Sequence, residues 1–112
     1  MTQQPSSSSQ SVTLATDQAG YLTPAHTVVT AAVASTLALA ANANRKYAIF
    51  VNDSDETLYL GLGAAAVLNK GIRLNASGGS YEMSALGGNL YAGAVYAIST
   101  SGGKLLLVTQ GV

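Results

Sequence analysis

Three carboxylates lie within four residues in the stretch DSDE, at Asp53, Asp55 and Glu56. Clustered carboxylate oxygens are the ligands that Ca²⁺ prefers, so a calcium loop is the first chemistry to consider. The stretch lacks the spaced Asp or Asn positions, the glycine and the distal glutamate of an EF-hand loop. Side chains of this kind also bond their own backbone in turns. We therefore expect a solvated hairpin turn here and no metal site.

The other residues that could do chemistry are few and scattered. His26 is the one histidine of the chain, and there is no cysteine. A metal site needs three or four converging ligands, and a serine hydrolase needs a base beside its nucleophile. Glu56 and Glu82 could be paired as the two carboxylates of a glycosidase, but only their presence supports that pairing. We predict no catalytic residue, no cofactor and no metal.

The stretch GLGAAAVLNKG, residues 61–71, is rich in glycine and alanine. Gly61, Gly63 and Ala66 reproduce the spacing of a dinucleotide-binding loop. Such a loop needs a long helix after it and a βαβ unit around it, and the sequence offers neither. We interpret the stretch as a loop between strands that contains at most one short turn of helix.

Tyrosines form the other conspicuous set, with six in the chain against one phenylalanine. Tyr59, Tyr81, Tyr91 and Tyr96 fall on expected strands. A tyrosine near a surface can pack at the edge of the core with its hydroxyl in water, join an oligomer interface, or stack on a sugar. All three uses stay open at this point. We predict partner contacts at Tyr59, Tyr81 and Tyr91.

Charged residues make up 9% of the chain, and five basic residues balance five acidic ones. This neutrality argues against nucleic acid or an anionic membrane as the partner, and it tolerates close neighbours. The longest apolar stretch, residues 27–41, is too short to span a bilayer. Arg45 and Arg73 could each pair with an acidic residue. Exposed pairs contribute less than about 1 kcal/mol, so they indicate no function.

The first 26 residues differ in composition from the rest. The stretch TQQPSSSSQS is polar and of low complexity, and the apolar residues after it have no period. Ordering such a segment costs about 25–50 kcal/mol of backbone entropy, which its sparse apolar side chains cannot offset alone. We predict an extended N-terminal arm over residues 1–26 that orders on a partner through Val12, Leu14, Tyr21 and Leu22. A tail without function is the alternative.

Residues 27–112 have the pattern of an all-β domain. Short β-branched and aromatic runs alternate with glycine-rich or polar turns. The predicted strands are 27–33, 35–41, 46–52, 57–62, 72–74, 80–83, 89–99 and 104–110. This spacing predicts an antiparallel β-sandwich or a small jelly-roll-like barrel. The predicted core residues are Ile49, Val51, Leu58, Leu60, Ile72, Leu74, Leu90, Val95, Ile98, Leu105 and Leu107.

Several sequence blocks in a fixed order resemble those of small β-rich virion proteins of tailed bacteriophages. The blocks are LAANANR, an apolar strand, NDS, LYLGLG, GIRL, GGSYE and LYAGAVYAI. They lie within residues 39–108 and leave the arm outside the resemblance. The asparagines and glycines also have a physical role, because they turn the chain and let strands close tightly.

The resemblance implies a structural component of a virus particle, of the capsid decoration or cement type. It implies that the partners are the major capsid protein and neighbouring copies of the same chain, in a dimer or trimer at the capsid surface of the virion. It carries over no catalytic residue. A tail or fibre component, or a module that binds host glycans through tyrosines, is the alternative.

Overall fold

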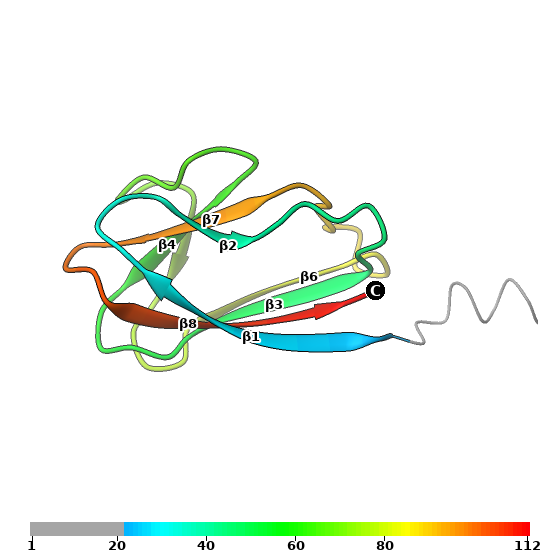
Figure 1. Cartoon of the computed structure of the whole chain (residues 1–112), viewed down its shortest axis with the longest axis horizontal. Coiled ribbons are helices and arrows are strands. Elements are labelled where there is room, and N and C mark those ends of the chain that lie inside the picture. The colour runs from blue at the N-terminus through cyan, green and yellow to red at the C-terminus, as the bar shows by residue number, and fades with distance from the viewer. Residues whose placement is uncertain (1–21) are drawn as a thin grey trace, which may run out of the picture.

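The computed structural model describes residues 22–112, which form eight strands with no helix among them (Figure 1). The strands, in chain order, are β1 (Pro24–Ala31), β2 (Thr36–Leu39), β3 (Tyr47–Asn52), β4 (Leu58–Leu62), β5 (Ile72–Leu74), β6 (Ser80–Ser84), β7 (Val95–Ser99) and β8 (Lys104–Gly111). Each is a short run rich in β-branched, leucine or aromatic residues, which suit a pleated, half-buried surface. Glycine, asparagine, aspartate and serine separate most of them, because these residues favour turns.

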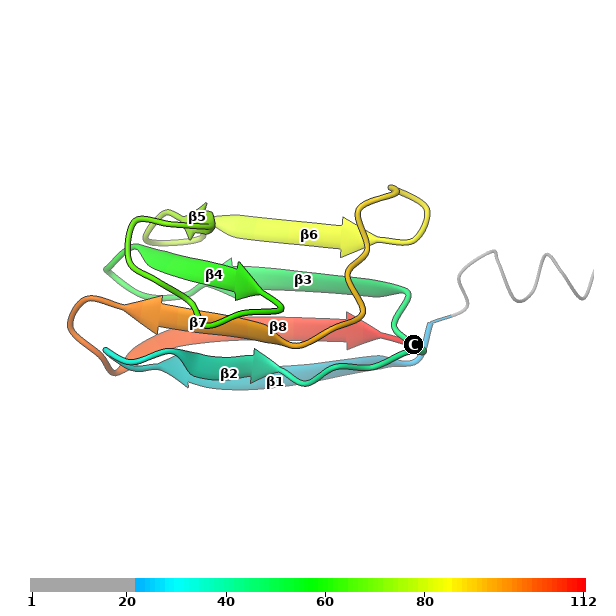
Figure 2. The ribbon, with the colours of Figure 1, turned by 90° about the horizontal axis from the view of Figure 1, so that it is seen from above.

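The strands form two antiparallel sheets of four strands that pack face to face (Figure 2). Sheet A has the order β1-β8-β3-β6, and sheet B has the order β2-β7-β4-β5. Each sheet has one apolar face to bury, and packing the two faces together covers both. The predicted all-β, antiparallel fold is confirmed, and of the two predicted architectures it is the sandwich.

The first strand begins earlier than the sequence indicated. It spans Pro24–Ala31 instead of residues 27–33, and Pro24 and His26 pair with Gly111 and Thr109 of β8. Thr23 also exchanges backbone hydrogen bonds with the last residue, Val112, at 2.8 and 3.2 Å. Sheet pairing therefore begins inside the segment that composition assigned to the arm, whose residues 1–21 lie outside the described part of the chain.

The strand predicted over residues 89–99 is shorter than expected. Only Val95–Ser99 forms β7, and the chain before it is irregular. The carbonyl groups of Tyr91 and Gly93 accept hydrogen bonds from the Arg45 side chain, and that of Ala92 accepts one from the backbone N of Asn42. Because these groups bond elsewhere, they do not extend the ladder of β7.

The core between the sheets is formed by alternate residues of the strands. Phe50, Leu60 and Leu106 are completely buried there. The whole cluster consists of Ala31, Ala38, Ala48, Phe50, Leu58, Leu60, Leu74, Met83, Val95, Ala97, Leu106 and Val108. The prediction was correct for Leu58, Leu60, Leu74 and Val95. Ile98 is also buried, but in a separate small cluster with Tyr59 and Ala66.

In β3 and β8 the predicted inward face was wrong by one position. The prediction placed Ile49, Val51, Leu105 and Leu107 in the core. The register instead pairs Phe50 with Val108 on the inward face, and Leu105 and Leu107 are 41% and 37% exposed. A shift of one residue exchanges the two faces of a strand. Both alternating sets of these strands are apolar, so their period could not identify the inward face.

This inversion of faces can be tested with two neighbouring leucines. Leu106→Ala should lower the free energy of unfolding by about 2–4 kcal/mol, because it opens a cavity in a closed core. Leu107→Ala should lower it by less than about 1 kcal/mol, because its side chain lies on the outer face. Urea denaturation of both variants measures the difference, and equal losses would contradict the assigned register.

Candidate functional site

A buried amide organises the acidic turn between β3 and β4. Asn52 is completely buried, and its Nδ2 donates to the carbonyl oxygens of Glu56 and Leu74 at 2.7 and 3.0 Å. Its Oδ1 accepts from the backbone N and the hydroxyl of Ser54 at 3.1 and 2.6 Å. The Ser54 hydroxyl bonds the backbone of Glu56, as predicted for the side chains of this turn, but the predicted hairpin is wrong, since β3 and β4 do not pair with each other. Because β3 and β4 belong to different sheets, this network also fixes how the chain crosses between them.

Two carboxylates of the turn bind the start of β8 and the connection that precedes it. Asp55 Oδ1 lies 2.7 Å from Lys104 Nζ. Glu56 accepts hydrogen bonds from the backbone N and the hydroxyl of Ser101 at 2.9 and 2.7 Å. Hydrogen bonds to the charged form favour it, so Lys104 lowers the pKa of Asp55 and the Ser101 hydroxyl lowers the pKa of Glu56. These groups hold two loops together.

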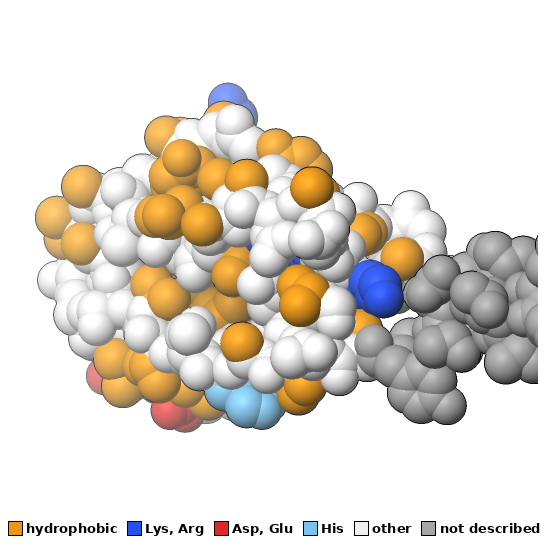
Figure 3. All heavy atoms as spheres, turned by 45° about the vertical axis from the view of Figure 1, so that its right-hand side comes forward, with side chains coloured by type: hydrophobic (Ala, Val, Ile, Leu, Met, Phe, Trp, Pro, Cys, Tyr) orange, Lys and Arg blue, Asp and Glu red, His pale blue; other side chains and the backbone are white. Residues whose placement is uncertain are grey.

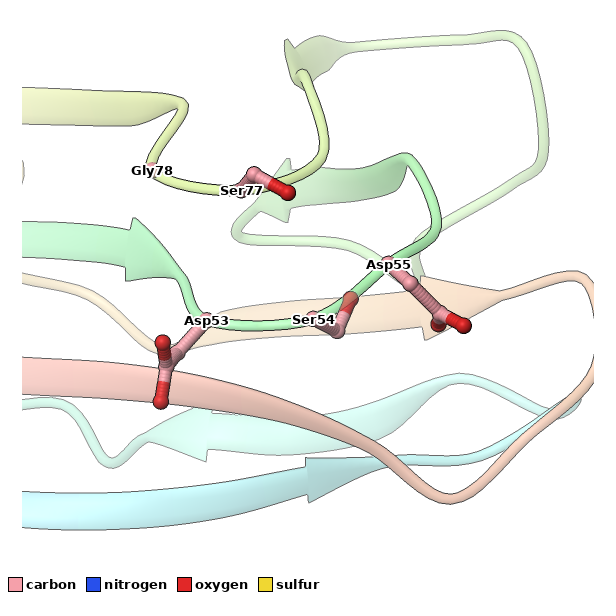
Figure 4. Close-up of a pocket in the computed structure, with 5 residues that line it drawn as sticks. All are labelled: Asp53, Ser54, Asp55, Ser77 and Gly78. Carbon is pink, nitrogen blue, oxygen red and sulfur yellow. The ribbon is translucent and has the colours of Figure 1, made fainter.

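A shallow, open hollow lies beside this turn (Figure 4). It is lined by Asp53, Ser54, Asp55, Ser77 and Gly78. The carboxylates of Asp53 and Asp55 point away from each other in Figure 4, and the backbone N of Ser77 donates to the carbonyl of Ser54 at 2.8 Å. Within residues 22–112, no three His, Cys, Asp or Glu side chains gather closely enough to hold a metal ion.

Arg45 is buried, with 2% of its surface exposed, and it has only neutral partners. Its Nε donates to Gln110 Oε1 at 2.7 Å. Its Nη1 donates to the carbonyls of Tyr91 and Gly93 at 2.6 and 3.0 Å, and its Nη2 donates to that of Ala40 at 2.5 Å. The ion pair that the sequence allowed is therefore replaced by carbonyl contacts, and burial lowers the pKa of this side chain. Arg45 ties three separate stretches of chain together.

Tyr59 lies on the outer face of sheet B, where its own chain covers it. Residues 63–71 fold over this face (Figure 1), and the Tyr59 ring packs with Ala66 and Ile98. The Tyr59 hydroxyl donates to Asn69 Oδ1 at 2.8 Å. The glycine-rich stretch is thus a loop between strands, as predicted, and it serves as a cover for sheet B. Tyr59 is 8% exposed, so a partner would reach little of its ring.

Tyr81 and Tyr91 are half-buried and pack against the main core. Tyr91 lies so close to Gly93 that a Cβ atom there would stand 2.4 Å from the Tyr91 hydroxyl. Gly93 therefore allows the close backbone approach that a glycine in this position indicates. Both rings therefore pack at the edge of the core, which is the first of the three uses of a tyrosine named above.

The predicted arm contacts are mostly beyond the described residues. Val12, Leu14 and Tyr21 lie outside them. Leu22 is described: it is 38% exposed, and its side chain packs over Gly111 of β8. The arm side of the partner surface therefore stays a prediction, apart from the position of its last residues against the sheet.

Sequence reasoning missed an apolar surface on the outer face of sheet A. The register aligns Val28, Leu107 and Val51 in one row across β1, β8 and β3. Leu105 and Ile49 occupy the same face in the adjoining rows. We call these five residues the sheet A patch. Apolar residues at alternate positions of β3 and β8 were the signal for this surface, but the prediction placed them in the core.

Polar groups surround the sheet A patch. His26 Nδ1 lies 2.8 Å from Thr109 Oγ1, and Tyr47 donates a 2.6 Å hydrogen bond to Glu82 Oε2, which raises the pKa of the tyrosine. Figure 3 shows hydrophobic side chains beside the histidine along the lower edge of the molecule. An exposed apolar patch with a polar rim is typical of an interaction site. The sheet A patch is therefore the first candidate surface.

The free edge of β1 is a second candidate surface. β1 has eight residues, pairs only with β8 among the described strands and contains no Asp, Glu, Lys or Arg. The other three edge strands are shorter: β2 has a register shift, β5 contains Arg73 and β6 contains Glu82. Charges, prolines, irregularities and shortness protect sheet edges from pairing, and of these β1 has only Pro24, at its first residue.

Comparison of the chain with protein-family models, with curated proteins and with solved structures finds no match in any of the three. The described part of the chain contains no helix that could cross a membrane. The choice of a function therefore depends on the two candidate surfaces and on the sequence blocks quoted above.

The acidic turn makes stability depend on pH. The folded pKa values of Asp55 and Glu56 are lowered from 3.8 and 4.5, so the unfolded chain takes up protons first as the pH falls. Their contribution is complete above these usual values and is lost as the pH falls through the lower folded values. Asp55→Asn with Glu56→Gln, and to a smaller degree Ser101→Ala, should flatten this acid loss in urea titrations. Identical pH profiles in all variants would contradict the role of these bonds.

Arg45 can be tested against the other arginine. Arg45→Met should lower the free energy of unfolding by about 2–4 kcal/mol, because four acceptor groups lose a charged donor in a buried place. Arg73→Met is the matched control and should stay within about 0.5 kcal/mol, because Arg73 is exposed and bonds only Asn75. Denaturant unfolding measures both, and equal effects would exclude a special role for Arg45.

Proposed function

We propose that this protein is a capsid decoration (cement) protein of a tailed bacteriophage, which binds the outer shell of major capsid proteins and stabilises it. The observation that carries the proposal is the open edge of β1, which continues directly into the N-terminal segment. The strand that pairs on one side only, among the described strands, is thus joined to a long, polar stretch of chain. The sequence blocks that resemble virion proteins support the same class.

The edge of β1 suits an extended segment of a partner. A peptide that adds to a sheet edge gains backbone hydrogen bonds along its length, and its alternate side chains contact the two faces of the sheet. Binding of the N-terminal segment along the shell would offset the entropy of ordering it, roughly 1–2 kcal/mol for each residue. We therefore assign the edge of β1 and the N-terminal segment to contacts with the major capsid protein.

The charge balance also supports a role in a crowded layer. The formal net charge is zero, so copies placed side by side repel each other little. Several of the charged groups already bond within the fold, since Lys104 pairs with Asp55 and Arg45 is buried among carbonyls. The remaining surface is suited to many copies on one particle.

The glycan-binding alternative has weaker support. It relies on open tyrosine rings, whereas Tyr59 is covered by its own loop and Tyr81 and Tyr91 pack on the core edge. A position in the tail or fibre is compatible with the same two surfaces. The location of the protein on the particle separates these functions.

Electron microscopy of purified source virions with an antibody against this chain gives the location. We expect label spread over the whole capsid surface at a regular spacing. Label confined to the tail would favour the alternative, and intact virions without any label would exclude a structural role in the mature particle.

Truncation tests the arm. Deletion of residues 1–21 should abolish or sharply weaken binding to capsids stripped of this protein, and thermal unfolding should show that the domain stays folded. The deletion must stop before Leu22, because Thr23 bonds Val112 and β1 starts at Pro24. Full occupancy of capsids by the truncated protein would overturn the proposed role of the arm.

A further inference from the structure

The described chain covers part of the outer face of sheet B and leaves the outer face of sheet A uncovered. On sheet B, residues 63–71 cover Tyr59 and Ile98 and leave them 8% exposed. On sheet A, no described segment covers the corresponding face, and Val28, Leu105 and Leu107 are 62%, 41% and 37% exposed. Apolar area removed from water contributes about 25 cal/mol for each Å². The sheet A patch therefore retains a driving force for association at strand positions like those that residues 63–71 cover on sheet B.

The polar residues beside the patch are arranged so that they could pair with the same residues of a second copy. One row crosses all four strands of sheet A in the order His26, Thr109, Ile49, Glu82. The row thus has an imidazole on the β1 edge and a carboxylate on the β6 edge. His26 uses Nδ1 on Thr109, which leaves Nε2 available, and Glu82 uses Oε2 on Tyr47, which leaves Oε1 available.

We propose that two copies of this chain pack through the outer faces of sheet A, about a twofold axis that runs parallel to the strands. Such an axis places β1 of one copy over β6 of the other and keeps each row at the same height. Leu107 then meets Val51 of the second copy, and His26 meets Glu82 of the second copy. Each Glu82 is kept apart from the other and faces an imidazole, so the interface pairs unlike polar groups and contains an apolar centre.

The size of the face sets the strength of this dimer. Four strands about 4.8 Å apart and six residues at about 3.3 Å each cover roughly 400 Å² on each copy. The total of roughly 800 Å² lies below the range of standard stable interfaces, about 1,200–2,000 Å². The dimer should therefore be weak in solution, with a Kd in the micromolar to millimolar range. The edge of β1 lies at its rim.

Analytical ultracentrifugation of the purified full chain, from micromolar to millimolar concentration, tests the face. We expect a reversible monomer–dimer equilibrium that Leu107→Lys abolishes, with Leu107→Ser as a second variant if the first does not fold. Leu37→Lys is the matched control, because Leu37 is 49% exposed on the outer side of sheet B. A monomer at every concentration, or equal effects of the Leu107 and Leu37 variants, would overturn the proposal.

A charge exchange tests the axis. His26→Glu places two carboxylates together at each end of the row, so the Kd should rise about tenfold. Adding Glu82→Lys in the same chain should return the Kd to within about threefold of the original, because each new Glu faces a new Lys across the interface. A double variant as weak as His26→Glu alone would overturn this geometry. Both experiments use the protein by itself, so their outcome is independent of where the protein lies on a particle.

Discussion

The burial of one positive charge constrains much of this fold. Arg45 lies among carbonyl groups from the residue after β2, the connection before β7 and the side chain of Gln110 on β8. A buried charge is costly unless hydrogen bonds compensate it, so these stretches must stay in place around the guanidinium. This requirement ties sheet A to sheet B at the end of the sandwich where the chain enters and leaves. It also delays the start of β7, because the carbonyls before it are engaged elsewhere.

Buried polar groups fasten the opposite end in the same way. Asn52 joins the end of β3 to the turn at Glu56 and to β5, and the hydroxyl of Ser99, which is completely buried, donates to the carbonyl of Ala31 at 3.0 Å. In the described residues every buried side-chain N or O atom has a partner. Most of the polar side chains that could have done chemistry therefore form hydrogen bonds to the segments that connect the two sheets. The surfaces that remain are a sheet face and a strand edge.

The difference between the two outer faces connects the fold with association. Residues 63–71 give sheet B a cover and leave sheet A with an apolar patch, while β1 combines an open edge with the start of the described chain. A weak contact through a face becomes effective when many copies are held close together, since the second contact is then made at a high effective concentration. In the layer of repeated subunits proposed above, the sheet A patch and the β1 edge would act together in this way.

Most of the strands of this protein could be predicted from the residues alone, although β1 begins earlier and β7 later than predicted. Short apolar runs between glycine, asparagine and aspartate turns indicated antiparallel strands, and the acidic stretch around Ser54 indicated a self-bonded turn, because both signals are local. The tertiary structure alone decided which face of β3 and β8 points inward, what Arg45 binds and which outer face is covered. Phe50 and Ile49, or Leu106 and Leu107, are equally apolar, so alternation cannot rank them. Their burial depends on the position of the opposite sheet, and that position is set by contacts between residues far apart in the chain, such as Arg45 with Gln110.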